Sequence, residues 1–166
     1  MRAALPLLLA CLWTLAGCGF QLRGTADLPF ETLFIPGATA GIGLDLKRNI
    51  QSGTRTRVVD DQKLAQAVLQ FTNEFREKVI LSLSGTGRVR EFQLRYRVEF
   101  RVLDGRGNEF LPLQVIVLTR DFTFNDTDVL AKELEEAQIF REMQFDMVQQ
   151  ILRRIATATP PKPLVK

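Results

Sequence analysis

The sequence predicts an α+β fold, a two-layer sandwich in which a four-stranded, mostly antiparallel sheet packs against two helices in the order β-α-β-β-β-α. The main observation is the strict alternation of apolar and polar residues over 91–104, which is typical of an antiparallel strand with one buried face. Two other segments each carry a single apolar stripe at helical spacing. Such helices and such a sheet can bury their apolar surfaces against each other.

The other strands are expected on either side of 91–104. A short run at 32–35 ends at Pro36-Gly37, and the β-rich run 68–83 is joined to the central strand by the loop 84–87. The turn 104–108 leads to a last strand over 113–124. The uncharged block 115–118 in that strand fits a segment that is covered on both sides or held within a larger assembly.

The two helices are predicted from apolar spacing. Ile42, Leu46 and Ile50 form one stripe, which closes at Ser52-Gly53. The longer helix follows residues 126–128, whose Asp and Thr side chains are candidate N-terminal caps. Its stripe consists of Leu130, Leu134, Ala137, Phe140, Val148, Ile151 and Ile155.

Residues 1–17 have the features of a secretory signal: Arg2, a short apolar body and small residues at the break. The apolar run is too short to span a membrane as a helix. The foursome ending in Cys18 resembles the lipobox of bacterial lipoproteins, which implies cleavage before Cys18 and acylation of its thiol and new amine. Gly19 follows where inner-membrane lipoproteins typically carry Asp, so we expect an outer-membrane anchor facing the periplasm. The alternative is an ordinary signal peptide in which Cys18 only happens to follow the cleavage site.

The mature chain would then consist of a lipid-anchored lead (18–30), one domain (31–156) and a Pro-rich tail (157–166) that we expect to be disordered. Removing Arg2 from the 22 Lys and Arg leaves 21 against 19 Asp and Glu, a net charge of +2. This near balance argues against a general polyanion binder, so no nucleic acid is expected as a partner. With Cys11 removed and Cys18 acylated, no disulfide could form within the mature domain.

An enzyme is disfavoured because the chain has no histidine. Ser-His-Asp, Cys-His and His-ligated metal chemistry are therefore excluded. A carboxylate-only or Ser-Lys site stays open, but no feature marks one. The run Gly85-Thr86-Gly87 is too short for a nucleotide loop and joins a strand to a strand. We expect neither a metal nor a cofactor.

Three motifs in order resemble the LptE (RlpB) family of lipopolysaccharide-assembly lipoproteins from Gram-negative outer membranes. They are Cys18–Gly24 (CGFQLRG), Glu91–Leu94 (EFQL), and Arg120–Phe122 (RDF) followed by Val129–Lys132 (VLAK). The resemblance implies a non-enzymatic protein that sits as a plug inside the β-barrel protein LptD and binds lipopolysaccharide. The alternative partner is another outer-membrane assembly machine, which this chain would serve as a periplasmic scaffold.

Lipid A carries phosphates and acyl chains, so its binding requires cations beside apolar surface. Arg88 and Arg90 at the expected hairpin are candidate ligands, and Lys132 matches the family position associated with lipopolysaccharide. The simpler alternatives are a solvated hairpin and a pair between Lys132 and Glu136. A further set of cations lies along the polar face of the central strand, where they are either ligands or a solvated face: Arg95, Arg97 and Arg101. Four aromatic residues could contact a barrel but are expected mainly in the core: Phe122, Phe124, Phe140 and Phe145.

Overall fold

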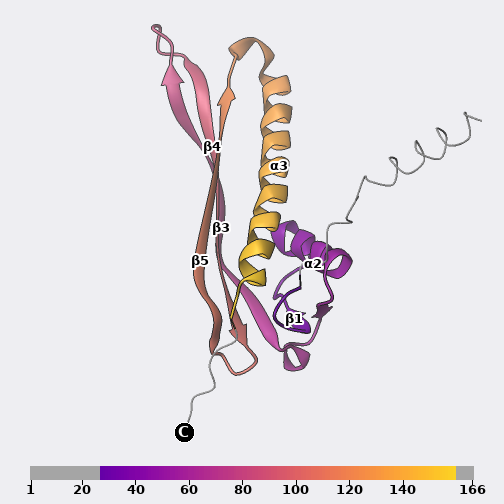
Figure 1. The fold of residues 1–166 in the computed structure, drawn as a ribbon. Helices are drawn as coiled ribbons and strands as arrows, with labels where there is room; N and C mark the ends of the chain where they lie inside the picture. Colours follow the sequence, from indigo (N-terminus) through magenta and orange to yellow (C-terminus); the bar gives the residue numbers. More distant parts are fainter. Residues whose placement is uncertain (1–26, 160–166) are drawn as a thin grey trace, which may run out of the picture.

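The computed structural model describes residues 27–159, and it confirms the α+β class with both helices on one face of the sheet (Figure 1). The signal peptide, Cys18, most of the lead and residues 160–166 lie outside the described part of the chain. The sheet has the strand order β2-β1-β3-β4-β5. It therefore contains five strands in the described residues, one more than the sequence predicts.

Three long antiparallel strands form the body of the sheet: β3 (Ala67–Leu83), β4 (Val89–Asp104) and β5 (Glu109–Thr123). Two three-residue strands, β1 (Thr32–Phe34) and β2 (Arg57–Val59), run parallel to each other, and β1 runs parallel to the start of β3. The strand β2 was missed because three residues give no readable alternation. A 3₁₀ turn at Gln62–Leu64 connects β2 to β3.

The two β-hairpins turn at glycines with positive φ, Gly87 (φ 81°) and Gly107 (φ 87°). In the β4–β5 turn the Asp104 carboxylate accepts hydrogen bonds from the backbone N–H groups of Arg106 and Asn108 and from the Asn108 side-chain amide, each at 2.8 Å. The bond from the Asn108 side chain is the main cause that lowers the pKa of Asp104.

Helix α2 (Gly41–Gly53) buries Ile42, Leu46 and Ile50, as the sequence predicts. Helix α3 (Val129–Ala156) packs its second half against β4. Its buried residues are Met143, Met147, Val148, Ile151 and Ile155. The β4 side chains that are fully buried are Leu94, Tyr96, Val98, Phe100 and Val102. The core therefore lies between β4 and the second half of α3, with α2 closing one end.

The predicted stripe is wrong for the start of α3, because Leu130 and Leu134 are 71% and 65% exposed, whereas Phe140 in the same stripe packs against the core. Of the three predicted caps, Asp128 does not act as one. Asp128 stands at the N-cap but makes no side-chain bond there, and the Asn125 side chain instead accepts from Thr127 N–H at 3.2 Å to cap the 3₁₀ turn Asp126–Asp128. The start of α3 therefore lacks apolar burial at Leu130 and Leu134 and a side-chain hydrogen bond from its own N-cap residue.

Candidate functional site

The two ends of the sandwich differ, and we name them by their elements. The proximal end contains β1, β2 and α2, and the distal end contains the β3–β4 hairpin and the start of α3 (Figure 1). At the distal end the Phe124 N–H donates to the carbonyl oxygen of Arg90 at 2.8 Å, which ties the end of β5 to the start of β4. Helix α3 begins at Val129, five residues after Phe124. Arg88, Arg90 and Lys132 therefore lie at the same end of the molecule.

An aromatic cluster lies between the sheet and α3 at this distal end. The ring of Phe92 stacks on that of Phe122, with centroids 6.5 Å apart, and meets Phe124 edge-on at 5.3 Å. Lys132 Nζ lies 5.3 Å from the centroid of Phe122, and Lys78 Nζ lies 4.9 Å from that of Phe92. Two lysines from different elements are thus held over one aromatic cluster by cation–π contacts.

Both lysines also have carboxylate partners. Lys132 Nζ pairs with Glu135 at 2.8 Å, and Lys78 Nζ pairs with Glu136 at 2.6 Å. The considered pair between Lys132 and Glu136 is therefore wrong, because Glu136 turns towards β3. The Lys132 side chain is only 20% exposed, so an anionic ligand would compete with Glu135 for it.

Exposed aliphatic side chains lie beside these cations. On the hairpin, Ile80 and Leu83 are 54% and 55% exposed, whereas Leu130 and Leu134 lie on the opposite face of α3 from Lys132, towards solvent. The hairpin residues Arg88 and Arg90 are exposed as well. The distal end therefore offers cations and aliphatic surface together, which suits a ligand that carries both acid groups and hydrocarbon chains.

Sequence reasoning missed Lys78 as a member of this cluster. It stands in a charge-rich part of β3, where Glu74, Arg76 and Glu77 precede it. Its charge is visible in the sequence, but the face of the sheet on which it lies depends on the pairing of β3 with β4.

The cations along β4 do not form a second cluster. Arg95 Nη1 pairs with Glu77 at 3.2 Å, the Arg97 guanidinium pairs with Glu99, and Arg101 Nε donates to Gln70 at 3.1 Å. Each is satisfied by a neighbour on the face of the sheet that faces away from the helices, so the structure supports the solvated-face interpretation for this group.

The four phenylalanines that could contact a barrel differ in burial. Phe122 is buried, at 3% exposed, and Phe124 and Phe140 are half-buried against the core cluster, as expected. Phe145 is 61% exposed, so it is not part of the core.

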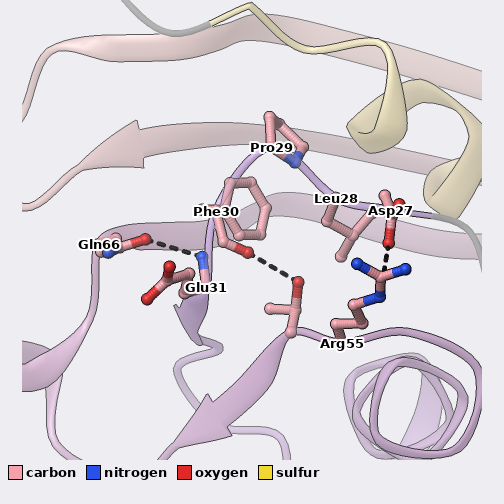
Figure 2. Close-up of a pocket in the computed structure, with 8 residues that line it drawn as sticks. Asp27, Leu28, Pro29, Phe30, Glu31, Arg55 and Gln66 are labelled. Atoms are coloured by element: carbon pink, nitrogen blue, oxygen red, sulfur yellow. Dashed lines mark hydrogen bonds and ion pairs between the residues drawn. The ribbon is translucent and has the colours of Figure 1, made fainter.

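A cavity of about 520 Å³ lies at the proximal end, where residues 27–31 enter the fold (Figure 2). Asp27 pairs with Arg55 at 3.5 Å, and the Thr56 hydroxyl donates to the Phe30 carbonyl at 2.8 Å. The Glu31 N–H donates to Gln66 Oε1 at 2.7 Å. These bonds join the entering chain to β2 and β3, so we interpret this region as the joint between lead and domain.

Two further observations concern residues 27–159 only. Their acidic side chains form no group of three that could hold a metal ion. Neither of their α-helices combines the length and the apolarity needed to cross a membrane. The fold and the distal site, with cations held beside aromatic and aliphatic surface, are those of a binding or adaptor protein.

Comparison with known proteins identifies the family. The family model for LptE, described as lipopolysaccharide-assembly, matches residues 29–155. The LPS-assembly lipoprotein LptE of Yersinia pestis (strain Pestoides F) is 34% identical over 146 residues, which cover 86% of this chain and 70% of the relative. This chain therefore belongs to the LptE lipopolysaccharide-assembly family, whose role is non-enzymatic, and the resemblance seen in the sequence is confirmed.

Solved structures agree. The chain is similar to an uncharacterized lipoprotein B from Nitrosomonas europaea, with 47% identity and a TM-score of 0.73 over 83% of this chain and 90% of that one. It is also similar to the rare lipoprotein B from Shewanella oneidensis, with 26% identity and a TM-score of 0.65 over 76% of this chain and 92% of that one. The α+β sandwich is thus shared with lipoproteins of the same kind.

Proposed function

We propose that this chain is an outer-membrane lipoprotein that joins the β-barrel protein LptD as a plug, binds lipopolysaccharide and supports its assembly into the outer leaflet. One structural observation supports the binding role most directly: Arg88, Arg90 and Lys132 lie at one end of the sandwich, where the hairpin also exposes Ile80 and Leu83. Membership in the lipopolysaccharide-assembly family supports the wider role. The barrel partnership rests on the family resemblance.

The proposed anchor is Cys18. Eight residues, 19–26, separate it from Asp27 at the proximal end, and an extended chain of that length spans at most about 30 Å. The 16 residues of β4 span about 50 Å in the other direction. An acylated Cys18 would therefore hold the proximal end near the periplasmic leaflet while the cationic distal end stands well away from the anchor.

In this proposal the ligand's phosphates would meet the hairpin arginines, and its acyl chains would cover Ile80 and Leu83. Arginine suits phosphate because its guanidinium can donate two parallel hydrogen bonds. Lys132 and Lys78 would add positive charge from α3 and β3, in competition with their own glutamates.

The test is lipopolysaccharide binding by the full-length chain in detergent, with Arg88→Glu/Arg90→Glu as the altered protein. We expect binding to weaken at least about tenfold, because two guanidinium contacts are replaced by repulsion. The matched control is Arg57→Glu/Lys63→Glu, which makes the same change of charge at exposed proximal positions and should bind normally. Equal binding by all three proteins would remove the hairpin from the site.

The barrel partnership needs its own measurement. The wild-type chain should carry LptD with it when it is purified from detergent-solubilised membranes. Recovery with the lipoproteins of another outer-membrane assembly machine, and without LptD, would overturn the plug proposal in favour of the scaffold alternative.

A further inference from the structure

A cavity of about 530 Å³ lies along the seam between β3 and α3, next to the aromatic cluster, and we call it the seam cavity. β1 pairs with β3 only at Ala67 and Val68, so no strand of the described residues covers the outer edge of β3 beside this cavity. Phe140 supplies an apolar wall. The charged lining residues are three cations and two acids: Arg76, Lys78, Arg141, Glu133 and Glu136.

The two arginines of the seam cavity are held by neutral amides. Arg76 Nη2 donates to the side-chain oxygen of Gln144, and Arg141 Nη2 donates to that of Gln138 at 2.6 Å. An amide oxygen orients a guanidinium group but does not neutralise its charge. The carboxylate of Glu74 lies 4.0 Å from Arg76 and also accepts a hydrogen bond from a tyrosine hydroxyl. The cavity therefore contains two oriented guanidinium groups whose amide partners leave their charge in place.

The third cation is neutralised inside the cavity. Lys78 Nζ pairs with Glu136 at 2.6 Å, so these two charges cancel. The remaining carboxylate of the lining is that of Glu133, which is exposed to solvent. Among the described lining residues, two guanidinium groups thus face one solvated carboxylate, and the cavity has an excess of positive charge.

Aromatic rings fix two of the cations before any ligand arrives. The Arg76 guanidinium carbon lies 4.6 Å from the centroid of Tyr96 and 5.7 Å from that of Phe140. Lys78 Nζ lies 4.9 Å from the centroid of Phe92. Cation–π contacts restrict both side chains, so less conformational entropy is lost when an anion binds to them.

The seam cavity is continuous with the hairpin. Arg76, Lys78 and Ile80 alternate along β3 on the side that faces α3, and Ile80 is 54% exposed. The β4 residue that pairs with Ser82 adjoins Arg90, and Ser82 lies four residues from Lys78, about 13 Å along the strand. A ligand with several acid groups and hydrocarbon chains can therefore reach from the hairpin, over Ile80, into the cavity.

We propose that the seam cavity binds a phosphate group of the same amphiphilic ligand whose other phosphates meet the hairpin, through Arg76, Lys78 and Arg141. This inference rests on the proposed function and extends its site along β3. The guanidinium groups of Arg76 and Arg141 can each donate two parallel hydrogen bonds to phosphate. Lys78 exchanges Glu136 for the ligand, so Glu136 acts as a built-in competitor that lowers the affinity.

The first test is lipopolysaccharide binding by the full-length chain in detergent, with Arg141→Glu as the altered protein. Arg141 is exposed and its bonded partner, Gln138, is on the same helix, so the fold should persist. Binding should weaken at least about fivefold, because a phosphate contact is replaced by repulsion. The matched control is Arg153→Glu, which reverses an exposed charge in the last turn of α3 and should bind normally.

Dephosphorylated lipopolysaccharide identifies the group that is bound. Wild type and Arg141→Glu should bind it equally, because the phosphate that contacts the cavity is missing. A loss that persists with this ligand would overturn the assignment to phosphate.

The competing carboxylate is tested with Glu136→Gln. This change frees Lys78 and should tighten lipopolysaccharide binding about two- to fivefold, the range expected for a partly exposed ion pair. The control Glu109→Gln removes an exposed acid at the start of β5 and should leave binding unchanged. Unchanged or weaker binding by Glu136→Gln would overturn the role given to Glu136.

The outcomes separate this inference from the proposed function. If Arg141→Glu binds like wild type while Arg88→Glu/Arg90→Glu binds weakly, the seam cavity is overturned and the proposed function stands. A wild type that does not bind lipopolysaccharide overturns both. Circular dichroism checks that each variant is folded. If Arg141→Glu fails to fold, Arg141→Gln replaces it, with a loss of about twofold expected because only the charge is removed; normal binding by Arg141→Gln would then overturn the seam cavity.

Discussion

The two halves of α3 are held against the sheet by different forces. In the second half Met143, Met147, Ile151 and Ile155 are fully buried. The first two turns are instead held through polar contacts: the Lys78–Glu136 ion pair joins the helix to β3, and Lys132 reaches the aromatic cluster through its ammonium, before Phe140 begins the apolar packing against the core. One continuous helix thus passes from a dry interface to a charged one, so the two halves should contribute unequally to stability.

A polar network marks the boundary between them. The Tyr96 hydroxyl donates to Glu74 at 2.6 Å, and the Arg76 guanidinium lies 4.6 Å from the centroid of the Tyr96 ring. Burial is the main cause that raises the pKa of Tyr96, and the bond to Glu74 raises it further. Gln144 on α3 accepts a hydrogen bond from the Arg76 guanidinium, and its Nε2 donates to Asp45 Oδ2 on α2 at 2.5 Å, so the network extends to α2. On the N-terminal side of this network, the stripe residues Leu130 and Leu134 of α3 are exposed to solvent.

The largest expected effect comes from comparing two members of the predicted stripe. Ile151→Ala should lower the free energy of unfolding by about 2–5 kcal/mol, because it leaves a cavity in the core. Leu134→Ala should change it by no more than about 0.5 kcal/mol, because Leu134 is already exposed to solvent. Chemical denaturation followed by circular dichroism measures both. Equal losses would mean that the two halves of α3 are held alike.

A smaller effect is expected at the charged interface. A double-mutant cycle with Lys78→Met and Glu136→Gln should give a coupling energy of about 0.5–1 kcal/mol, since the two side chains are 36% and 21% exposed and solvent screens the pair. The coupling should decrease when salt is added. A coupling that is unaffected by salt would show that packing, rather than charge, holds the first half of α3.

The smallest effect is expected at the β4–β5 turn, outside both halves of α3. The pKa of Asp104 is lowered from its ordinary value of 3.8, so its contribution to stability is present above that value and is lost as the pH falls below it. Asp104→Asn should therefore lower the melting temperature slightly at pH 7. The difference from wild type should shrink under acid conditions. A difference that persists unchanged at low pH would assign the effect to turn geometry instead of charge.

Much of the fold could be predicted because β4 and α2 follow simple periods. β4 alternates without interruption, and the three apolar residues of α2 fall on one face, so local sequence and burial agree there. The first half of α3 could not be predicted in the same way. Leu130 and Leu134 have the correct spacing for burial, but whether such residues are buried depends on the surface opposite them, which comes from distant strands.

The candidate site was predictable only in part. The hairpin position and the family motif predict Arg88, Arg90 and Lys132, and the structure brings them to one end. Lys78, by contrast, has no motif, and its position over Phe92 follows from tertiary pairing. Three equally basic residues of β4 are not part of the site: Arg95, Arg97 and Arg101. Their carboxylate and amide partners lie on the neighbouring strand β3 or two residues along β4, and the strand register brings each partner to its arginine.

The bulge after Phe71 has one further consequence. Before it, odd-numbered residues of β3 point towards the helices, as the pairing of Phe71 with Phe100 shows; after it, even-numbered ones do, and Lys78 lies opposite Leu94. A single inserted residue thus reverses the parity of the strand. Without it, Phe75 and Val79 would point inward, and the ammonium of Lys78 would end on the far side of the sheet. The aromatic cluster would then keep only one of its two cation–π contacts, although the sequence of side chains around it would be the same.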